Sequence, residues 1–344
     1  MLTSSSMNAT VAKIRAVRGK MFTQQQYREL MLKQTVPECA EYLAQSPRYK
    51  DVFRDADPNT IHRGYLEELL QKANLETYNR LCGFQQLDSI PYYGFLLARM
   101  EIENILLMIN SINSDLDKPV LTQLPGYAIK HSRVNLLELS QAGSFEELLE
   151  VLRGTPYRKP LLKVKTDPSG RADYTECELA LRKDYFERLI QDVEHDFHGR
   201  EEKEIKDIIL YEVDTMNIIN AYRMKKYFGY SPERIKQSLI NVKGNPMGRL
   251  KEYFELSDPD DMLEWLKTTK YGKGMRETGI IETGIADIRY RKLSHILSST
   301  TSAPAALYAY VRLSAVEVSN IVHIIEAVRY GADTTQLEHD LLIF

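Results

Sequence analysis

The chain has 344 residues, of which 43% are hydrophobic and 27% are charged, a composition typical of a globular protein with two or three domains. Its formal net charge is −3. This charge argues against a general nucleic-acid-binding surface and against a polybasic membrane anchor, because both need an excess of Lys and Arg. We therefore expect no nucleic-acid partner.

The cysteines and the N-terminal segment indicate an intracellular protein. Cys39, Cys82 and Cys177 lie far apart and outside any metal-ligand spacing, as expected of reduced thiols that pack in a core. Residues 1–10 are rich in Ser and Thr and hold no apolar run, so we expect no secretory signal. No apolar run reaches the length of a membrane span, so any membrane association is expected to come through a partner.

Apolar residues recur at spacings of three and four along most of the chain, which is the pattern of amphipathic helices. Such stretches predict helices at residues 24–34, 64–81, 95–113, 145–152, 176–197, 201–228 and 305–330. Alternation typical of strands is absent from the sequence. The sequence therefore predicts an all-α fold.

Local signals predict where helices begin and where loops connect them. Ser144 precedes one amphipathic stretch, and Ser231 is followed by Pro232, which suits the first position of a helix. Asp258 is interpreted as a helix cap. Residues 272–285, which are rich in Gly, and residues 297–304, which are rich in Ser and Thr, are predicted to be mobile loops.

A short helical motif, an acidic residue followed three positions later by Asn and then by Ile, occurs three times. The copies are Glu101 with Asn104 and Ile105, Asp214 with Asn217 and Ile218, and Glu317 with Asn320 and Ile321. Positions three apart share one face of a helix, so each carboxylate is expected beside its own amide. We interpret each copy as a buried pair that satisfies itself and ties helices together, in preference to a ligand or metal site.

A tyrosine follows each motif at a matching distance. Tyr157 comes 53 residues after Asn104, and Tyr271 comes 54 residues after Asn217, each at the end of a Leu-x₄-Tyr segment. The counterpart for the third motif is Tyr49 near the N-terminus, in a segment that is one residue longer. We predict that these tyrosines pack at helix ends with hydrogen-bonded hydroxyl groups.

The third copy is therefore split between the two ends of the chain. We predict that these ends meet and close a pseudo-threefold body of three helical domains. The expected domains are residues 1–95 together with 306–344, residues 96–205, and residues 206–305.

Together these landmarks resemble the C-subunit family of archaeal and bacterial V/A-type ATPases, which corresponds to the d subunit of the eukaryotic vacuolar ATPase. The resemblance covers about residues 10–344 and rests on the recurrence of the acidic-x-x-Asn motif and of the tyrosine segments. Arg223 also matches an arginine common in the middle of the family's chains, whereas Val322 stands where the family often has arginine. The resemblance implies a closed funnel of three helical domains.

The resemblance also implies the function of a non-catalytic rotor subunit, with no cofactor and no metal. In that family the subunit sits on the membrane rotor ring, receives the central stalk, and passes torque between the ATP-driven shaft and the ion-carrying ring. The implied partners are the central-stalk shaft subunits and the membrane rotor ring. The implied location is cytoplasmic and peripheral to the membrane, and the isolated chain is expected to be a monomer.

Two other classes of function fit parts of the sequence. A helical repeat protein can act as an independent scaffold or adaptor that binds partners in a groove. His195 and His198 would share one helix face and could hold a metal ion in a helical enzyme, but no further ligand cluster accompanies them in the sequence. A solvated helix end is the favoured interpretation of this segment.

Overall fold

The computed structural model describes residues 4–54, 56–57, 61–84, 87–114, 132–243, 250–256, 258–276, 281–332, 337 and 341. The described residues form helices joined by turns, and their single β-bridge joins Thr166 to Ala172. The predicted all-α fold is confirmed. Within the described ranges, no helix combines the length and the hydropathy needed to cross a membrane.

The chain divides into two compact units, Met1–Ser89 with Tyr271–Phe344, and Ile90–Lys270. The first unit contains α1 (Ser4–Arg18), α2 (Gln24–Met31), α3 (Val36–Gln45), α4 (Lys50–Phe53), α5 (Arg63–Gly83), the 3-10 turn η1 (Leu87–Ser89), α16 (Ile281–Ser299) and α17 (Ala303–Tyr330). The second contains the 3-10 turn η2 (Pro91–Gly94), α6 (Phe95–Ser114), α8 (Leu136–Gln141), α9 (Phe145–Val151), α10 (Arg158–Leu161), α11 (Tyr174–Asp196), α12 (Gly199–Phe228), α13 (Pro232–Gln237), α14 (Lys251–Glu255) and α15 (Pro259–Thr268).

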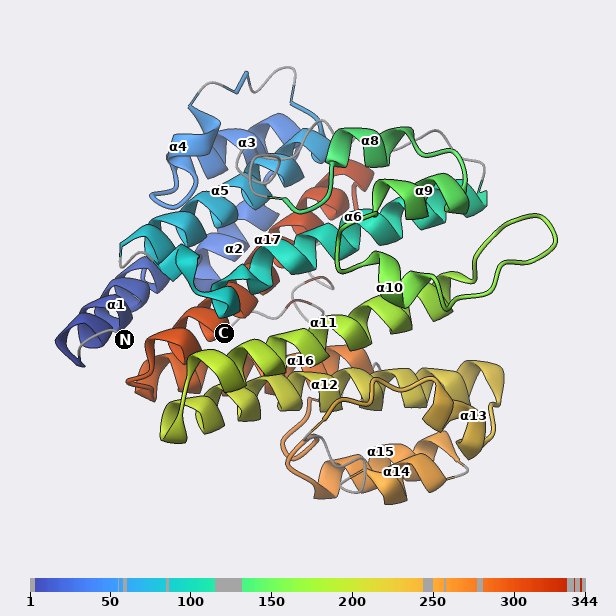
Figure 1. Cartoon of the computed structure of the whole chain (residues 1–344). Helices are drawn as coiled ribbons and strands as arrows, with labels where there is room; N and C mark the ends of the chain where they lie inside the picture. The colour runs from blue at the N-terminus through green and yellow to red at the C-terminus, as the bar shows by residue number, and fades with distance from the viewer. Residues whose placement is uncertain are drawn as a thin grey trace. The chain divides into compact units, whose positions relative to one another are not determined.

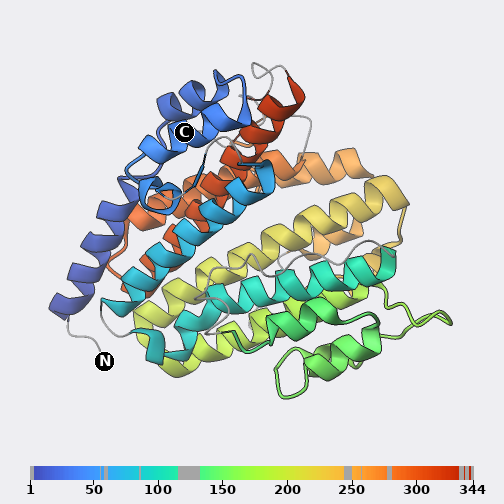
Figure 2. The ribbon, with the colours of Figure 1, turned by 90° about the horizontal axis from the view of Figure 1, so that it is seen from above.

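Helix α17 is the central element of the first unit. It packs against α16, α5, α1, α2 and α3, and Figures 1 and 2 show this red helix among the blue N-terminal ones. Its apolar stripe of Ile321, Ile324, Ile325 and Val328 is buried against leucines of the N-terminal helices, including Leu43. Because apolar burial is the main favourable term in folding, this stripe joins the two ends of the chain in one core.

Three long helices organise the second unit. Helix α11 packs against both α6 and α12, and the three run side by side in Figures 1 and 2. The short helices α8 and α9 form a hairpin, and α8 packs on α6. The helices α13 and α15 contact α12, and α14 contacts both of them.

The predicted helix caps at Ser144, Ser231 and Asp258 are confirmed. Each side chain accepts a hydrogen bond from a backbone N–H in the first turn, at Glu147, Arg234 and Asp260 respectively. Such bonds satisfy donors that a helix start leaves without an intrahelical partner.

The two predicted loops are helical over part of their length: residues 272–276 and 300–302 lie outside the helices, and residues 277–280 lie outside the described ranges. Residues 281–285 belong to α16, where Ile281 and Ile285 are buried. Gly284 lies inside this helix, where a Cβ atom would come within 2.4 Å of Met275 Cγ. The glycine therefore serves close packing rather than mobility. Residues 297–299 also belong to α16, and α17 begins at Ala303.

The same order of elements occurs three times along the chain. A long helix (α6, α12 or α17) is matched with two or three short helices, a buried tyrosine and a further long helix (α11, α16 or α5). This order agrees with the three copies seen in the sequence. The pseudo-threefold arrangement, the funnel and the three domain boundaries stay predictions.

Candidate functional site

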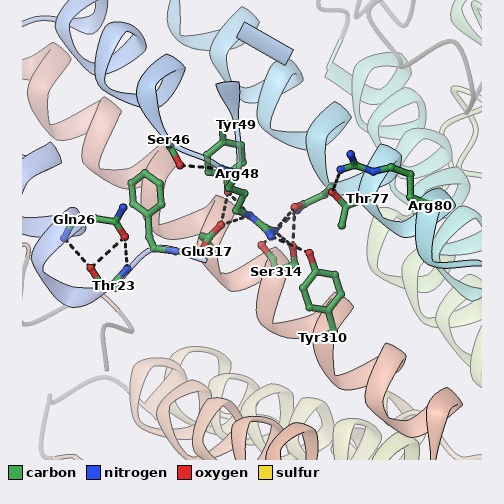
Figure 3. A network of polar contacts seen from close by, with 12 residues as sticks. Thr23, Gln26, Ser46, Arg48, Tyr49, Thr77, Arg80, Tyr310, Ser314 and Glu317 are labelled. Atoms are coloured by element: carbon green, nitrogen blue, oxygen red, sulfur yellow. Dashed lines mark hydrogen bonds and ion pairs between the residues drawn. The ribbon is translucent and has the colours of Figure 1, made fainter. Parts of the chain in front are cut away.

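Glu317 lies in the middle of α17 with its side chain only 1% exposed, and three donors from the N-terminal segment surround its carboxylate. Tyr49 Oη donates to Oε1 over 2.5 Å, and the backbone N–H of Phe22 donates to Oε2 over 2.6 Å. Arg48 Nε lies 2.5 Å from Oε1 and forms an ion pair with it. Figure 3 shows the converging side chains, which we call the Glu317 cluster. A buried carboxylate needs such partners, because burial without them is costly.

Arg48 extends this cluster toward α5 and the first half of α17 (Figure 3). Its guanidinium donates to Tyr310 Oη and to Asn74 Oδ1, both over 2.8 Å, and also to the hydroxyl of Ser314. Burial disfavours the charge of Arg48, but the adjacent Tyr49 and Glu317 outweigh burial and hold its pKa above the ordinary value. The guanidinium therefore stays charged while its side chain is only 4% exposed.

Two buried tyrosines near Glu317, Tyr49 of the cluster and Tyr27 of α2, are held neutral. Burial, together with the carboxylate of Glu317, raises the pKa of Tyr49 and of Tyr27 well above the ordinary value of 10.0. Asn320 hydrogen-bonds to Tyr27, so the amide of the third motif takes part through a tyrosine. A neutral phenol can donate a hydrogen bond to a carboxylate, which is how Tyr49 acts here.

A second cluster with the same design surrounds Glu101 on α6 in the second unit. Oε1 accepts hydrogen bonds from the Ser132 hydroxyl over 2.8 Å and from the backbone N–H of Arg133 over 2.5 Å, and Tyr157 donates to Oε2. Burial and Glu101 raise the pKa of Tyr157. The Arg188 guanidinium carbon lies 5.3 Å from the centre of the Tyr157 ring, and that of Arg48 lies 5.4 Å from the centre of the Tyr49 ring.

The middle motif on α12 is arranged differently. Asp214 is 2% exposed and Asn217 is fully buried. The Asn217 side chain exchanges two hydrogen bonds with the backbone of Ile240, donating to its carbonyl over 2.8 Å and accepting from its N–H over 2.9 Å. This amide fixes the chain after α13 to α12. Tyr271 is 3% exposed and Arg223 lies on an exposed face of α12.

The chain matches one known protein family over nearly its whole length. Residues 10–339 match the family model described as ATP synthase (C/AC39) subunit.

The chain belongs to this family.

Several curated relatives of the family share low identity with the chain over most of its length. The C subunit of the A-type ATP synthase of Desulfurococcus sp. (strain SY) is 25% identical, and the match covers 95% of this chain and 88% of that protein. The protein of the same name from Thermococcus kodakarensis is 21% identical and covers 94% of this chain and 86% of its own length. That from Thermococcus onnurineus is 26% identical over 77% of this chain and 69% of its own length. The resemblance noted in the sequence is confirmed.

The hydrogen bonds of Glu101 and Glu317 differ from the expected pairing of each carboxylate with the Asn of its own motif. Glu101 and Glu317 take donors from other segments of the chain, chiefly tyrosine hydroxyls and backbone N–H groups. Asn104 instead donates to the carbonyl of Met100, one turn earlier on its own helix, over 2.8 Å. The i, i+3 spacing places both side chains on one helix face, but it carries no information on donors that reach the carboxylate from distant segments.

Sequence reasoning missed Arg48, Asn74, Tyr310 and Ser314. The repeat does not single out Arg48, because Pro156 and Lys270 stand at the matching positions and the guanidinium near the Tyr157 ring comes from Arg188 on α11. A buried Arg beside a buried Glu is visible only once α17 is placed against the N-terminal segment.

The His195 segment lies at the exposed end of α11. The side chain of His195 is 80% exposed, and its Nδ1 lies 2.8 Å from Oδ1 of Asp196. The other carboxylate oxygen of Asp196 accepts a hydrogen bond from the backbone N–H of Tyr92. In the described part of the chain, no group of three or more His, Cys, Asp and Glu side chains is placed to hold a metal ion.

Proposed function

We propose that this chain is a non-catalytic subunit of an A-type rotary ATPase, which couples the central-stalk shaft to the membrane rotor ring. The observation that carries the proposal is the family match over residues 10–339, together with relatives named as the C subunit of an A-type ATP synthase. The chain would be peripheral to the membrane, on its cytoplasmic side, through these two partners.

The geometry of the two clusters suits a part that transmits torque. A torsional load tends to slide packed helices past one another, and apolar contacts alone resist sliding weakly because they have no direction. Hydrogen bonds and ion pairs are directional, and a buried carboxylate that loses its donors is strongly destabilised. The clusters at Glu317 and Glu101 therefore act as fixed points within the helical packing of each unit.

The coupling role is tested by removing the chain from the assembled complex. ATP hydrolysis by the water-soluble part is expected to continue, while ATP-driven ion transport into sealed vesicles is expected to be lost. Adding back the purified chain should restore transport, and so should Lys72→Gln, a surface variant outside both clusters. Ion transport that persists without the chain would contradict the proposal.

The partners are tested by pull-down of the tagged chain from membranes in a mild detergent. Shaft and ring subunits are expected to co-purify, whereas an independent scaffold or adaptor would bring down neither. Recovery of the tagged chain in good yield without those subunits would refute the proposed partners. Light scattering of the isolated chain is expected to give the mass of a monomer, 39.7 kDa.

A further inference from the structure

A cavity of about 450 Å³ opens beside the Glu317 cluster, within the first unit. Three segments line it: part of α1, residues 47–51 and the last turns of α5. Arg48 contributes to the wall, so the cavity adjoins the ion pair with Glu317. Figure 3 shows Thr77 and Arg80, both of which line the cavity, on the side of Arg48 away from Thr23.

The lining carries a marked excess of positive charge. Lys13 and Lys20 of the α1 region and Arg80 of α5 contribute three cations in addition to Arg48. Asp51 is the single acidic side chain among the described residues that line the cavity, and it forms an ion pair with Arg54 at 3.1 Å. A chain whose formal net charge is −3 has thus gathered like charges around one concave surface, where they raise the local potential for anions.

The other contacts of these cations are consistent with a ligand site. The guanidinium of Arg48 is occupied by Glu317, Tyr310 and Asn74, so it shapes the wall while its charge is balanced. Arg80 donates a hydrogen bond from its Nη2 to the Thr77 hydroxyl over 3.1 Å, which orients the guanidinium and keeps other donors available. The ammonium of Lys13 lies 3.8 Å from the centre of the Phe84 ring.

We propose that this cavity binds a small, multiply charged oxyanion of the diphosphate class through Lys13, Lys20 and Arg80. A planar guanidinium binds phosphate oxygens with two parallel hydrogen bonds, and lysines add point charges and further donors. The volume exceeds that of one phosphate group and admits two. The ligand would bridge α1 and α5 across the segment that carries Tyr49, and so stabilise the first unit. This inference concerns the isolated chain and does not depend on its proposed partners.

Binding is tested on the full-length chain with inorganic pyrophosphate as the probe, with chloride at equal ionic strength as the control. Pyrophosphate is expected to raise the melting temperature in a saturable manner beyond the effect of chloride, because a ligand of the folded state stabilises it by mass action. Inorganic phosphate is expected to bind more weakly. Equal melting temperatures in pyrophosphate and chloride would overturn the proposal.

The site is located with three variants measured by calorimetric titration. Arg80→Gln and Lys20→Gln are each expected to weaken pyrophosphate binding about tenfold, the effect of removing one charge-assisted contact. Lys72→Gln, on the same helix α5 but ion-paired with Glu76 outside the cavity, should bind as the natural chain does. Pyrophosphate binding unchanged in Arg80→Gln and Lys20→Gln would likewise overturn the proposal.

The contribution of guanidinium geometry is separated from that of charge with Arg80→Lys. This variant keeps the positive charge but loses the planar pair of donors, so its affinity is expected to lie between those of the natural chain and Arg80→Gln. Since Arg80 is exposed, these substitutions should leave the circular dichroism spectrum unchanged.

Discussion

Tyr49 donates a hydrogen bond to Glu317, a residue 268 positions further along the chain, over 2.5 Å. Both side chains are buried, and the bond joins the segment that precedes α4 to the middle of α17. The ion pair between Arg48 and Glu317 runs parallel to it. The stability of the first unit should therefore depend on this contact more than on any exposed ion pair.

Glu317→Gln is expected to lower the free energy of unfolding by about 3 to 5 kcal/mol, because it leaves the buried guanidinium of Arg48 without its counter-ion. Urea unfolding followed by circular dichroism measures this change. The matched control is Glu326→Gln, also on α17, which removes a half-exposed ion pair with Arg63 and should cost less than about 1 kcal/mol. Equal costs for the two variants would contradict the role given to the Glu317 cluster.

Tyr157→Phe is expected to cost about 1 to 3 kcal/mol, since it removes one donor to Glu101 and leaves the ring volume intact. Tyr174→Phe is the control, because this tyrosine at the start of α11 is 38% exposed. Thermal melting of both variants measures the difference. A Tyr157→Phe variant as stable as the natural chain would show that Ser132 and the backbone N–H of Arg133 suffice for Glu101.

Alkaline pH is expected to unfold the protein through its buried tyrosines. The pKa of Tyr49 and of Tyr157 is raised by burial, so the folded state keeps these phenol protons where the unfolded state, with a pKa near 10.0, has lost them. Their contribution is fully present below pH 10.0 and falls as pH rises above it, by about 1.4 kcal/mol per pH unit for each tyrosine.

Urea titrations between pH 8 and pH 11 measure this alkaline dependence. The double variant Tyr49→Phe with Tyr157→Phe should show a flatter profile above pH 10 than the natural chain. If stability stays level up to pH 11 in the natural chain, the two phenols are not held neutral by the fold.

The thiols are expected to resist alkylation in the folded protein. All three cysteines are buried and carry thiols that are not in disulfides, and burial raises the pKa of Cys39 and of Cys177 to about 12. Since the thiolate is the reactive form, iodoacetamide at pH 8 should modify none of them within the time that modifies all three in 8 M urea, about an hour or less. Rapid modification of Cys39 in the folded chain would show that α3 opens readily.

The sequence predicts elements well where a helix is amphipathic and carries its own start signal. Ser231 with Pro232 marks α13, and the apolar stripe around Ile321 marks α17. Helix α1 carries no such signal, because it has neither an acidic first turn nor a strong apolar face and is positioned by contacts with α17. The start of α16 resembles a loop because of Gly284, whose reason is a tertiary contact with Met275.

The repeat locates Glu101, Glu317, Tyr49 and Tyr157 by their spacing alone, but it does not identify which atoms bind which. Repeats report only what the copies share. The partners that differ between copies, such as Arg48 in one and Arg188 in the other, are set by the packing of each copy. The proposed oxyanion cavity has no counterpart in any motif, since its lining comes from three separate segments.

The joining of residues from both ends in one unit has a consequence for synthesis on the ribosome. Arg48 and Tyr49 leave the exit tunnel long before Glu317 is translated, and the segment Ile90–Lys270 that lies between them forms a unit of its own. Domains generally fold as units in the order of their completion. The N-terminal helices therefore keep their apolar faces exposed until α17 has been synthesised. We expect a chaperone to bind these faces during translation.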